Sequence, residues 1–145
     1  MNNSHTDILL NNILSDAGNF SLVIFGFSAT LFTVLYSFII GRREQLKEIS
    51  DRIKNGEKDI LLTQRKTNAV TYINSLRNLN RHLIVSLFLS LGNYIATIIS
   101  KYIQFDSEIK ILLIIIFSTL GIGILIHIIF LLIKTVRKYR KSTKV

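Results

Sequence analysis

The chain has 145 residues, enough for one small domain, and its 18 Lys and Arg outnumber its nine Asp and Glu. It contains no cysteine, which excludes disulfides and cysteine nucleophiles, and no proline, which excludes proline kinks. Apolar residues make up 49% of the chain, and they are grouped in long runs separated by charged segments. This segregation is typical of a membrane protein.

Residues 1–19 precede the first apolar run and contain two acids but no Lys or Arg. Ile8, Leu9, Ile13 and Leu14 fall on one helical face, which predicts a short amphipathic helix lying on the outer surface of the membrane. A frayed terminus is the alternative. Because a signal peptide needs a basic segment before its apolar run, the run that follows is interpreted as a permanent span.

Three apolar runs cover residues 20–40, 83–103 and 111–133. Each matches the roughly 20 residues that an α-helix needs to cross a bilayer. Three such runs in so short a chain leave almost nothing to bury them in a soluble core. The sequence therefore predicts an all-α membrane protein with three transmembrane helices.

The charges of the connecting segments predict the orientation. Residues 41–82 hold ten Lys and Arg against five acids, and the tail 134–145 holds six Lys and Arg and no acid. In the outer loop 104–110, residues 104–109 carry Asp106 and Glu108 and no Lys or Arg. Because positively charged segments stay inside, we expect a multi-pass protein of the bacterial inner (plasma) membrane, with its N-terminus outside and its C-terminus in the cytoplasm.

The connector 41–82 is predicted to form a cytoplasmic helical hairpin that turns near residues 54–57, where Asn55 and Gly56 form a turn signal. Leu46, Ile49 and Ile53 recur on one face of the first arm. The second arm, residues 59–82, is longer than the first, residues 42–54. We therefore expect it to bend, break or splay, with Thr67-Asn68 and Asn78 to Asn80 as the candidate positions.

Polar residues form a stripe along each predicted span. The first span has Thr30 and Thr33, with Gly26 and Ser37 in register, and the third has His127, with Thr119 and Gly123. In the second span, the spacing of four, three, four and three residues keeps one helical face polar: Ser86, Ser90, Asn93, Thr97 and Ser100.

These stripes have two interpretations. Small and hydroxylated residues pack helices together in membranes, and the same residues line water-filled pores. Either interpretation favours a homo-oligomer, because three helices alone form a thin bundle. His127 is an ionisable group inside a span, so it either donates a hydrogen bond to a neighbouring helix or takes part in gating or proton transfer.

The C-terminal tail carries basic residues directly after the third span, which predicts contact with anionic membrane lipids. RNA binding is an alternative with the same electrostatic basis, and a cytoplasmic protein partner also remains open. The predicted lipid-binding residues are Lys134, Arg137, Lys138, Arg140 and Lys141.

Arg77, Asn78 and His82 have the spacing R-N-x3-H. This resembles the R-x4-H motif of HEPN ribonucleases, in which Arg and His from two copies act together on RNA. Together with the membrane spans, the motif resembles the small membrane accessory proteins of type VI-B CRISPR systems, one branch of which forms an oligomeric pore. The resemblance implies weak catalytic candidates at these three residues and a role in antiviral defence. The alternative is a basic cluster at the lipid headgroups.

The chain has no phosphate-binding loop, no pair of carboxylates in a span and no metal-ligand motif, so we expect neither an enzyme nor a bound cofactor or metal. The leading hypothesis is a small oligomeric inner-membrane protein that forms a pore or perturbs the membrane, as an antiviral effector. A holin-like lysis protein is one alternative. The other is a non-conducting anchor or assembly subunit whose hairpin docks a cytoplasmic partner through Leu46, Ile49 and Ile53.

Overall fold

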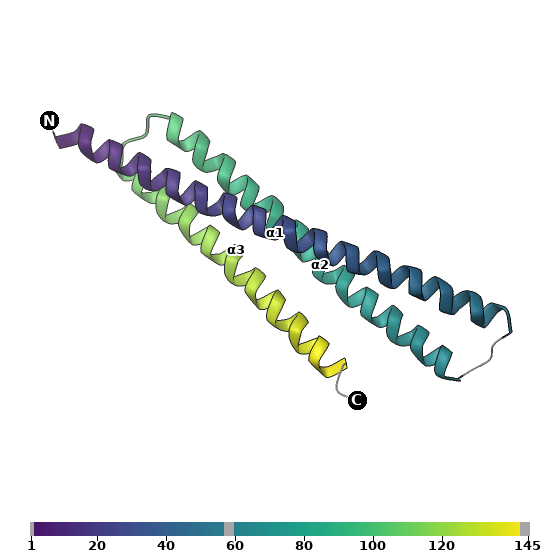
Figure 1. Cartoon of the computed structure of the whole chain (residues 1–145). Coiled ribbons are helices and arrows are strands. Elements are labelled where there is room, and N and C mark those ends of the chain that lie inside the picture. The colour runs from purple at the N-terminus through teal and green to yellow at the C-terminus, as the bar shows by residue number, and fades with distance from the viewer. Residues whose placement is uncertain (1, 57–59, 143–145) are drawn as a thin grey trace. The chain divides into compact units, whose positions relative to one another are not determined.

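The computed structural model describes the backbone of residues 2–56 and 60–142, and the side chains of residues 5–56 and 60–137. Three α-helices account for nearly all of it: α1 (Asn2–Lys54), α2 (Ile60–Tyr102) and α3 (Ser107–Ser142) (Figure 1). Each is long and apolar enough to cross a membrane. The prediction of an all-helical protein with three such helices is therefore confirmed.

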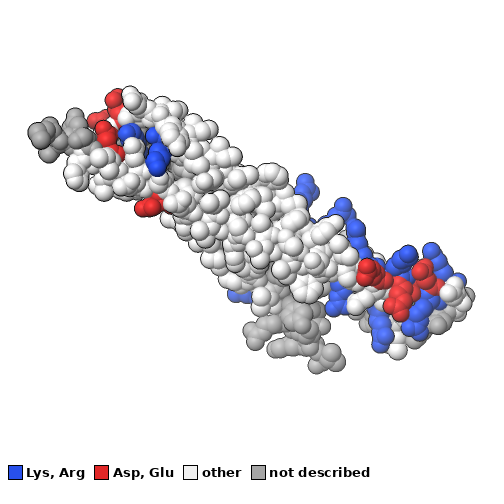
Figure 2. All heavy atoms as spheres, turned by 45° about the horizontal axis from the view of Figure 1, so that its top comes forward, with Lys and Arg blue, Asp and Glu red and all other residues white. Residues whose placement is uncertain are grey.

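The chain divides into two compact units. The bundle unit comprises residues Met1–Ala29 and Ile84–Val145, and the hairpin unit comprises residues Thr30–Leu83. The bundle unit therefore contains the first half of α1, the second half of α2 and all of α3. On the face in view in Figure 2, charged side chains crowd the hairpin unit, whereas most of the surface of the bundle unit is uncharged.

The sequence predicted a separate amphipathic helix before Phe20, and this prediction is wrong. Helix α1 runs without interruption from Asn2 to Lys54. Leu10, Leu14 and Ala17 are buried in the bundle unit, while Ile8 and Leu9 are exposed. The face that packs within the bundle unit is thus the one that carries Leu10, Leu14 and Ala17, whereas Ile13 of the predicted apolar face is exposed like Ile8 and Leu9.

Two helices of the bundle unit present buried residues at alternating intervals of three and four, the spacing of one helical face. On α1 these residues continue from Leu14 and Ala17 through Ser21, Ile24 and Ser28. On α3 the interval is four and then three, at Ile124, Ile128 and Leu131. The helix α3 begins after Asp106, whose carbonyl oxygen accepts a hydrogen bond from the backbone N–H of Lys110 at 3.0 Å.

The hairpin unit is an antiparallel pair of helices with its own small core. Ile39 of α1 clusters with Ile73 and Leu76 of α2, and Leu35, Leu46 and Tyr72 pack around them. After Lys54 the backbone N–H of Asn55 bonds to the carbonyl oxygen of Asp51, and Gly56 follows with φ of +98°, a conformation that glycine adopts without strain.

The expected break in the second arm is wrong, because α2 is one helix from Ile60 to Tyr102. Thr67 does bond back to the carbonyl oxygen of Thr63 at 3.1 Å, but this leaves the helix intact. The expectation assumed that the outer ends of spans 20–40 and 83–103 lie level. In the bundle unit Lys101 instead contacts Ser15. Residues before Phe20 therefore lie alongside the end of α2. With this alignment the second arm of the hairpin has no excess length that a break would have to absorb.

The close approach of α1 to α2 in the bundle unit depends on Gly18. A Cβ atom at this position would lie 2.7 Å from Oγ1 of Thr97, closer than side chains tolerate. Thr97 is itself buried, so it has little room to move. The glycine therefore sets how near the two helices come.

We predict that Gly18→Ala destabilises the bundle by roughly 1–3 kcal/mol, the usual cost of overpacking. The matched control is Gly26→Ala on the same helix, where a Cβ would meet nothing within 4 Å. Alanine favours a helix more than glycine does, so this control should unfold at the same or a higher temperature. Thermal unfolding of both variants in detergent, followed by circular dichroism, measures the difference; equal midpoints would contradict the close-packing argument.

Candidate functional site

The centre of the bundle unit is a polar junction at Asn93, which is 5% exposed. Its side-chain amide donates one hydrogen bond to Oγ of Ser21 on α1, at 2.8 Å, and another to the carbonyl oxygen of Phe117 on α3, at 3.0 Å. Ser21 in turn donates to the carbonyl oxygen of Ala17 at 3.1 Å. One amide group therefore joins all three helices through both of its hydrogens.

The whole polar stripe of α2 is buried together with Asn93: Ser86, Ser90, Asn93, Thr97 and Ser100. Two of its hydroxyls bond to their own helix, Ser90 to the carbonyl oxygen of Leu87 at 3.0 Å and Thr97 to that of Tyr94 at 2.6 Å. In the single chain this stripe therefore faces protein.

The partners of the α2 stripe on α1 differ from those that the sequence predicted. The sequence pointed to Thr30 and Thr33, but the buried small residues of α1 are Ala17, Ser21 and Ser28. These residues are spaced by four and seven positions, as members of the α2 stripe are. This spacing could have identified them from the sequence. The apolar run that begins at Phe20 hides this signal, because the first of the three residues lies before it.

An ion pair that the sequence did not indicate closes the end of the bundle unit near the α2–α3 linker. Nζ of Lys110 lies 3.2 Å from Oδ1 of Asp7, and the Lys110 side chain is 9% exposed. Nearby in the same unit, Nζ of Lys101 donates to Oγ of Ser15 at 2.8 Å. Both lysines are thus held by the first turns of α1, which anchors these turns to α2 and α3.

The remaining predicted pore or interface residues lie on the exterior of their units. Thr30 and Thr33 are exposed on α1 in the hairpin unit, and His127 is exposed on α3 in the bundle unit, as are Thr119 and Gly123. Thr119, Gly123 and His127 therefore form an exposed polar set on α3, distinct from the buried stripe of α2, while Thr30 and Thr33 are exposed in the other unit.

The weak catalytic candidates Arg77, Asn78 and His82 are all exposed on α2. Arg77 and His82 are five residues apart on one uninterrupted helix, so their side chains point about 140° apart around its axis. A single copy therefore does not bring the arginine and the histidine together, and joint action on RNA would need a second chain.

Two of the predicted lipid-binding residues of the tail, Lys134 and Arg137, are exposed at the end of α3. The other three, Lys138, Arg140 and Lys141, belong to the same helix, but their side chains lie outside the described residues. Because α3 continues to Ser142, the basic tail is helical through its first nine residues.

Comparison with known protein families, with curated proteins and with solved structures gives no match. The chemistry of the site must therefore be judged from the chain alone. The buried junction offers hydroxyl and amide groups that are already engaged with one another, an arrangement suited to holding helices together. The exposed charges of the hairpin and the tail are the groups available to outside partners.

We predict that Asn93→Ala lowers the stability of the bundle by about 1 kcal/mol, because two hydrogen bonds between helices are lost in an apolar environment. The matched control is Asn68→Ala, which removes an exposed amide from the same helix. Unfolding by titration with a denaturing detergent compares the two. Equal stability of both variants would show that the junction does not hold the bundle together.

Proposed function

We propose that this protein is a non-conducting membrane anchor that holds a helical hairpin in the cytoplasm, where the hairpin docks a partner protein. The observation that carries the proposal is the burial of the α2 polar stripe within one chain. A pore needs polar groups that are available to water and ions. The strongest such set in the sequence is instead engaged in packing, centred on the bonds from Asn93 to Ser21 and Phe117.

The charge distribution supports a cytoplasmic hairpin and an inner-membrane location. Residues 41–82 carry ten Lys and Arg, and the tail 134–145 carries six. The two lysines near the α2–α3 linker are both engaged by α1, Lys110 with Asp7 and Lys101 with Ser15. Since positively charged segments remain in the cytoplasm, the hairpin and the C-terminus would lie there and the N-terminus outside.

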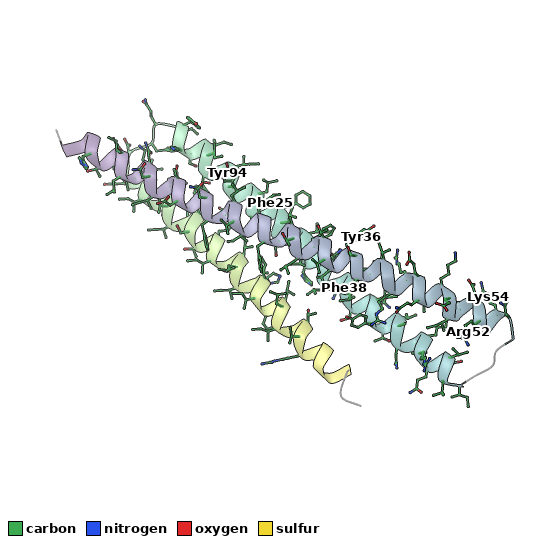
Figure 3. All side chains as sticks on the ribbon, in the orientation of Figure 1. Phe25, Tyr36, Phe38, Arg52, Lys54 and Tyr94 are labelled. Atoms are coloured by element: carbon green, nitrogen blue, oxygen red, sulfur yellow. The ribbon has the colours of Figure 1, made fainter. Side chains whose placement is uncertain are left out.

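An apolar surface near the hairpin turn supports docking. Ile60 is 86% exposed and Leu61 is 60% exposed at the start of α2, and Arg52 and Lys54 lie at the end of α1 beside the turn (Figure 3). These two adjacent side chains form a small apolar surface that a partner protein would cover on docking. Leu46, which one interpretation of the sequence placed in contact with a partner, instead packs against the core of the hairpin unit.

We predict that Ile60→Ser with Leu61→Ser abolishes the binding of a cytoplasmic partner, because both exposed apolar side chains are removed. Affinity purification of the tagged full-length chain from its native cells, after crosslinking, measures the ratio of partner to bait. The matched control is Val70→Ser, a partly exposed apolar residue on the same helix, which should leave this ratio unchanged. Equal recovery of the partner by both variants would contradict docking at the turn.

A second candidate is an oligomeric protein that forms a pore or perturbs the membrane, as an antiviral effector. The exposed polar set supports it, since Thr119, Gly123 and His127 lie on the surface of α3. Several copies of the chain that meet through this face of α3 would place its polar residues around a shared centre, where they would line a water-filled path. The motif of Arg77, Asn78 and His82 is consistent with the same class of protein.

The second candidate predicts ion flux through liposomes that contain the purified protein, and a loss of this flux in Thr119→Val with His127→Leu. The matched control is Ile126→Leu, an exposed apolar residue beside His127, which should conduct like the unchanged chain. Absence of flux at every protein density, from an oligomer or a monomer alike, would exclude the pore and leave the anchor.

A further inference from the structure

The register of the hairpin unit brings a basic stretch of α2 beside an apolar stretch of α1. Ile39 packs with both Ile73 and Leu76, and the guanidinium of Arg42 lies 5.6 Å from the centre of the Tyr72 ring. Because the helices are antiparallel, a residue one position earlier on α1 lies level with a residue one position later on α2. Averaged over these three contacts, Tyr36 lies level with residues 77–78 of α2, so Arg77 is about 1 Å and Arg81 about 5 Å from it in height, one on either side.

The two arginines and Tyr36 also share one flank of the hairpin. Arg77 and Arg81 each follow a core residue, Leu76 and Asn80, and Tyr36 follows Leu35. A residue that follows a core position lies about 100° further round its helix, and in an antiparallel pair this rotation brings both helices to the same flank.

Two observations agree with this assignment of flanks. Tyr72 precedes the core residue Ile73, and it is Tyr72 that Arg42 contacts, on the opposite flank. Figure 3 shows Tyr36 and Phe38 on opposite sides of α1, as expected for residues that follow Leu35 and precede Ile39.

A buried amide lies between the two arginines. Asn80 is 8% exposed, and its Oδ1 has no hydrogen-bond partner among the described residues. A carbonyl oxygen left in this state costs stability, because it has lost its contacts with water and gained no donor. Its position, next to Arg81 and one helical turn from Arg77, places an unsatisfied polar group at the base of a basic surface.

We infer that Arg77, Arg81, Tyr36 and Asn80 form a binding site for the head group of an anionic phospholipid. The two guanidinium groups would hold the phosphate by paired hydrogen bonds. The Tyr36 hydroxyl would donate to the phosphate, and Oδ1 of Asn80, which can only accept, would accept from a hydroxyl of a glycerol head group.

The neighbouring surface identifies a lipid as the occupant. Two exposed residues of α1 share the flank of the arginines: Tyr36, at 52%, and Ile40, which follows the core residue Ile39, at 42%. A lipid provides hydrocarbon for these side chains and a phosphate for the arginines, whereas RNA would leave the side chains in water. The site does not depend on the hairpin docking a partner, only on the helices crossing the membrane.

The test is native mass spectrometry of the full-length chain released from nanodiscs that contain equal amounts of phosphatidylglycerol and phosphatidylcholine. We expect retained phosphatidylglycerol on the unchanged chain, and roughly tenfold less on Arg77→Gln with Arg81→Gln. The matched control, Arg52→Gln with Arg65→Gln, removes the same charge from exposed positions elsewhere in the hairpin and should retain the lipid. Circular dichroism of each variant verifies that the helices are intact.

Asn80→Leu distinguishes a lipid site from a merely structural amide. If the Asn80 amide contacts no ligand, the substitution should raise stability and leave the amount of retained lipid unchanged. If the amide contacts the head group, the variant should retain several-fold less phosphatidylglycerol. Equal lipid retention by the Arg77/Arg81 variant and its control would overturn the site. Displacement of the lipid by inorganic phosphate or by a short single-stranded RNA at equal concentration would also overturn it, and would assign the arginines to that ligand.

Discussion

The bundle unit depends on the two hydrogen bonds from the side-chain amide of Asn93. In the interior of a membrane protein an amide must find partners within the protein, because lipid offers none. Asn93 finds Ser21 on α1 and the backbone of Phe117 on α3. Sliding α1 along its axis by one turn would remove the Ser21 hydroxyl from this amide, whereas α3 contributes a backbone carbonyl oxygen. Small residues around it, Gly18 above all, then allow the helices to approach closely enough for the bonds to form.

Pairing of α1 with α2 is fixed within each unit by a few contacts at definite heights. In the bundle unit Ser21, Gly18 and Ser15 meet Asn93, Thr97 and Lys101 in turn. Within the hairpin unit, the packing of Ile39 with Ile73 and Leu76 sets the antiparallel register. That register matters for function because it decides which charged residues of α2 lie beside which apolar residues of α1. The lipid site proposed at Arg77 and Arg81 rests on this pairing, and neither helix alone would indicate it.

Much of the fold could be predicted from the sequence, because long apolar runs and alternating intervals of three and four residues report helices directly. The spacing of Ser86, Ser90, Asn93, Thr97 and Ser100 likewise marks one face of α2 by periodicity alone. The partners of that face could not be predicted, since hydropathy gives no information on which helices touch or at what height. The same gap explains the incorrect break in α2, which rested on an assumed alignment of the spans, and the missed pairing of Asp7 with Lys110, two residues that are 103 positions apart.

The double role of Asn93 also has a consequence for the biogenesis of the protein. The chain emerges from the ribosome in order, so α1 and α2 enter the membrane before α3. The bond to Ser21 joins the first two helices, and the bond to the Phe117 carbonyl oxygen needs the third. A two-helix insertion intermediate can therefore already satisfy one hydrogen of the amide, while the other remains open until α3 arrives. That unsatisfied hydrogen gives the incoming helix a specific docking point at the stage when the translocon releases it to the lipid.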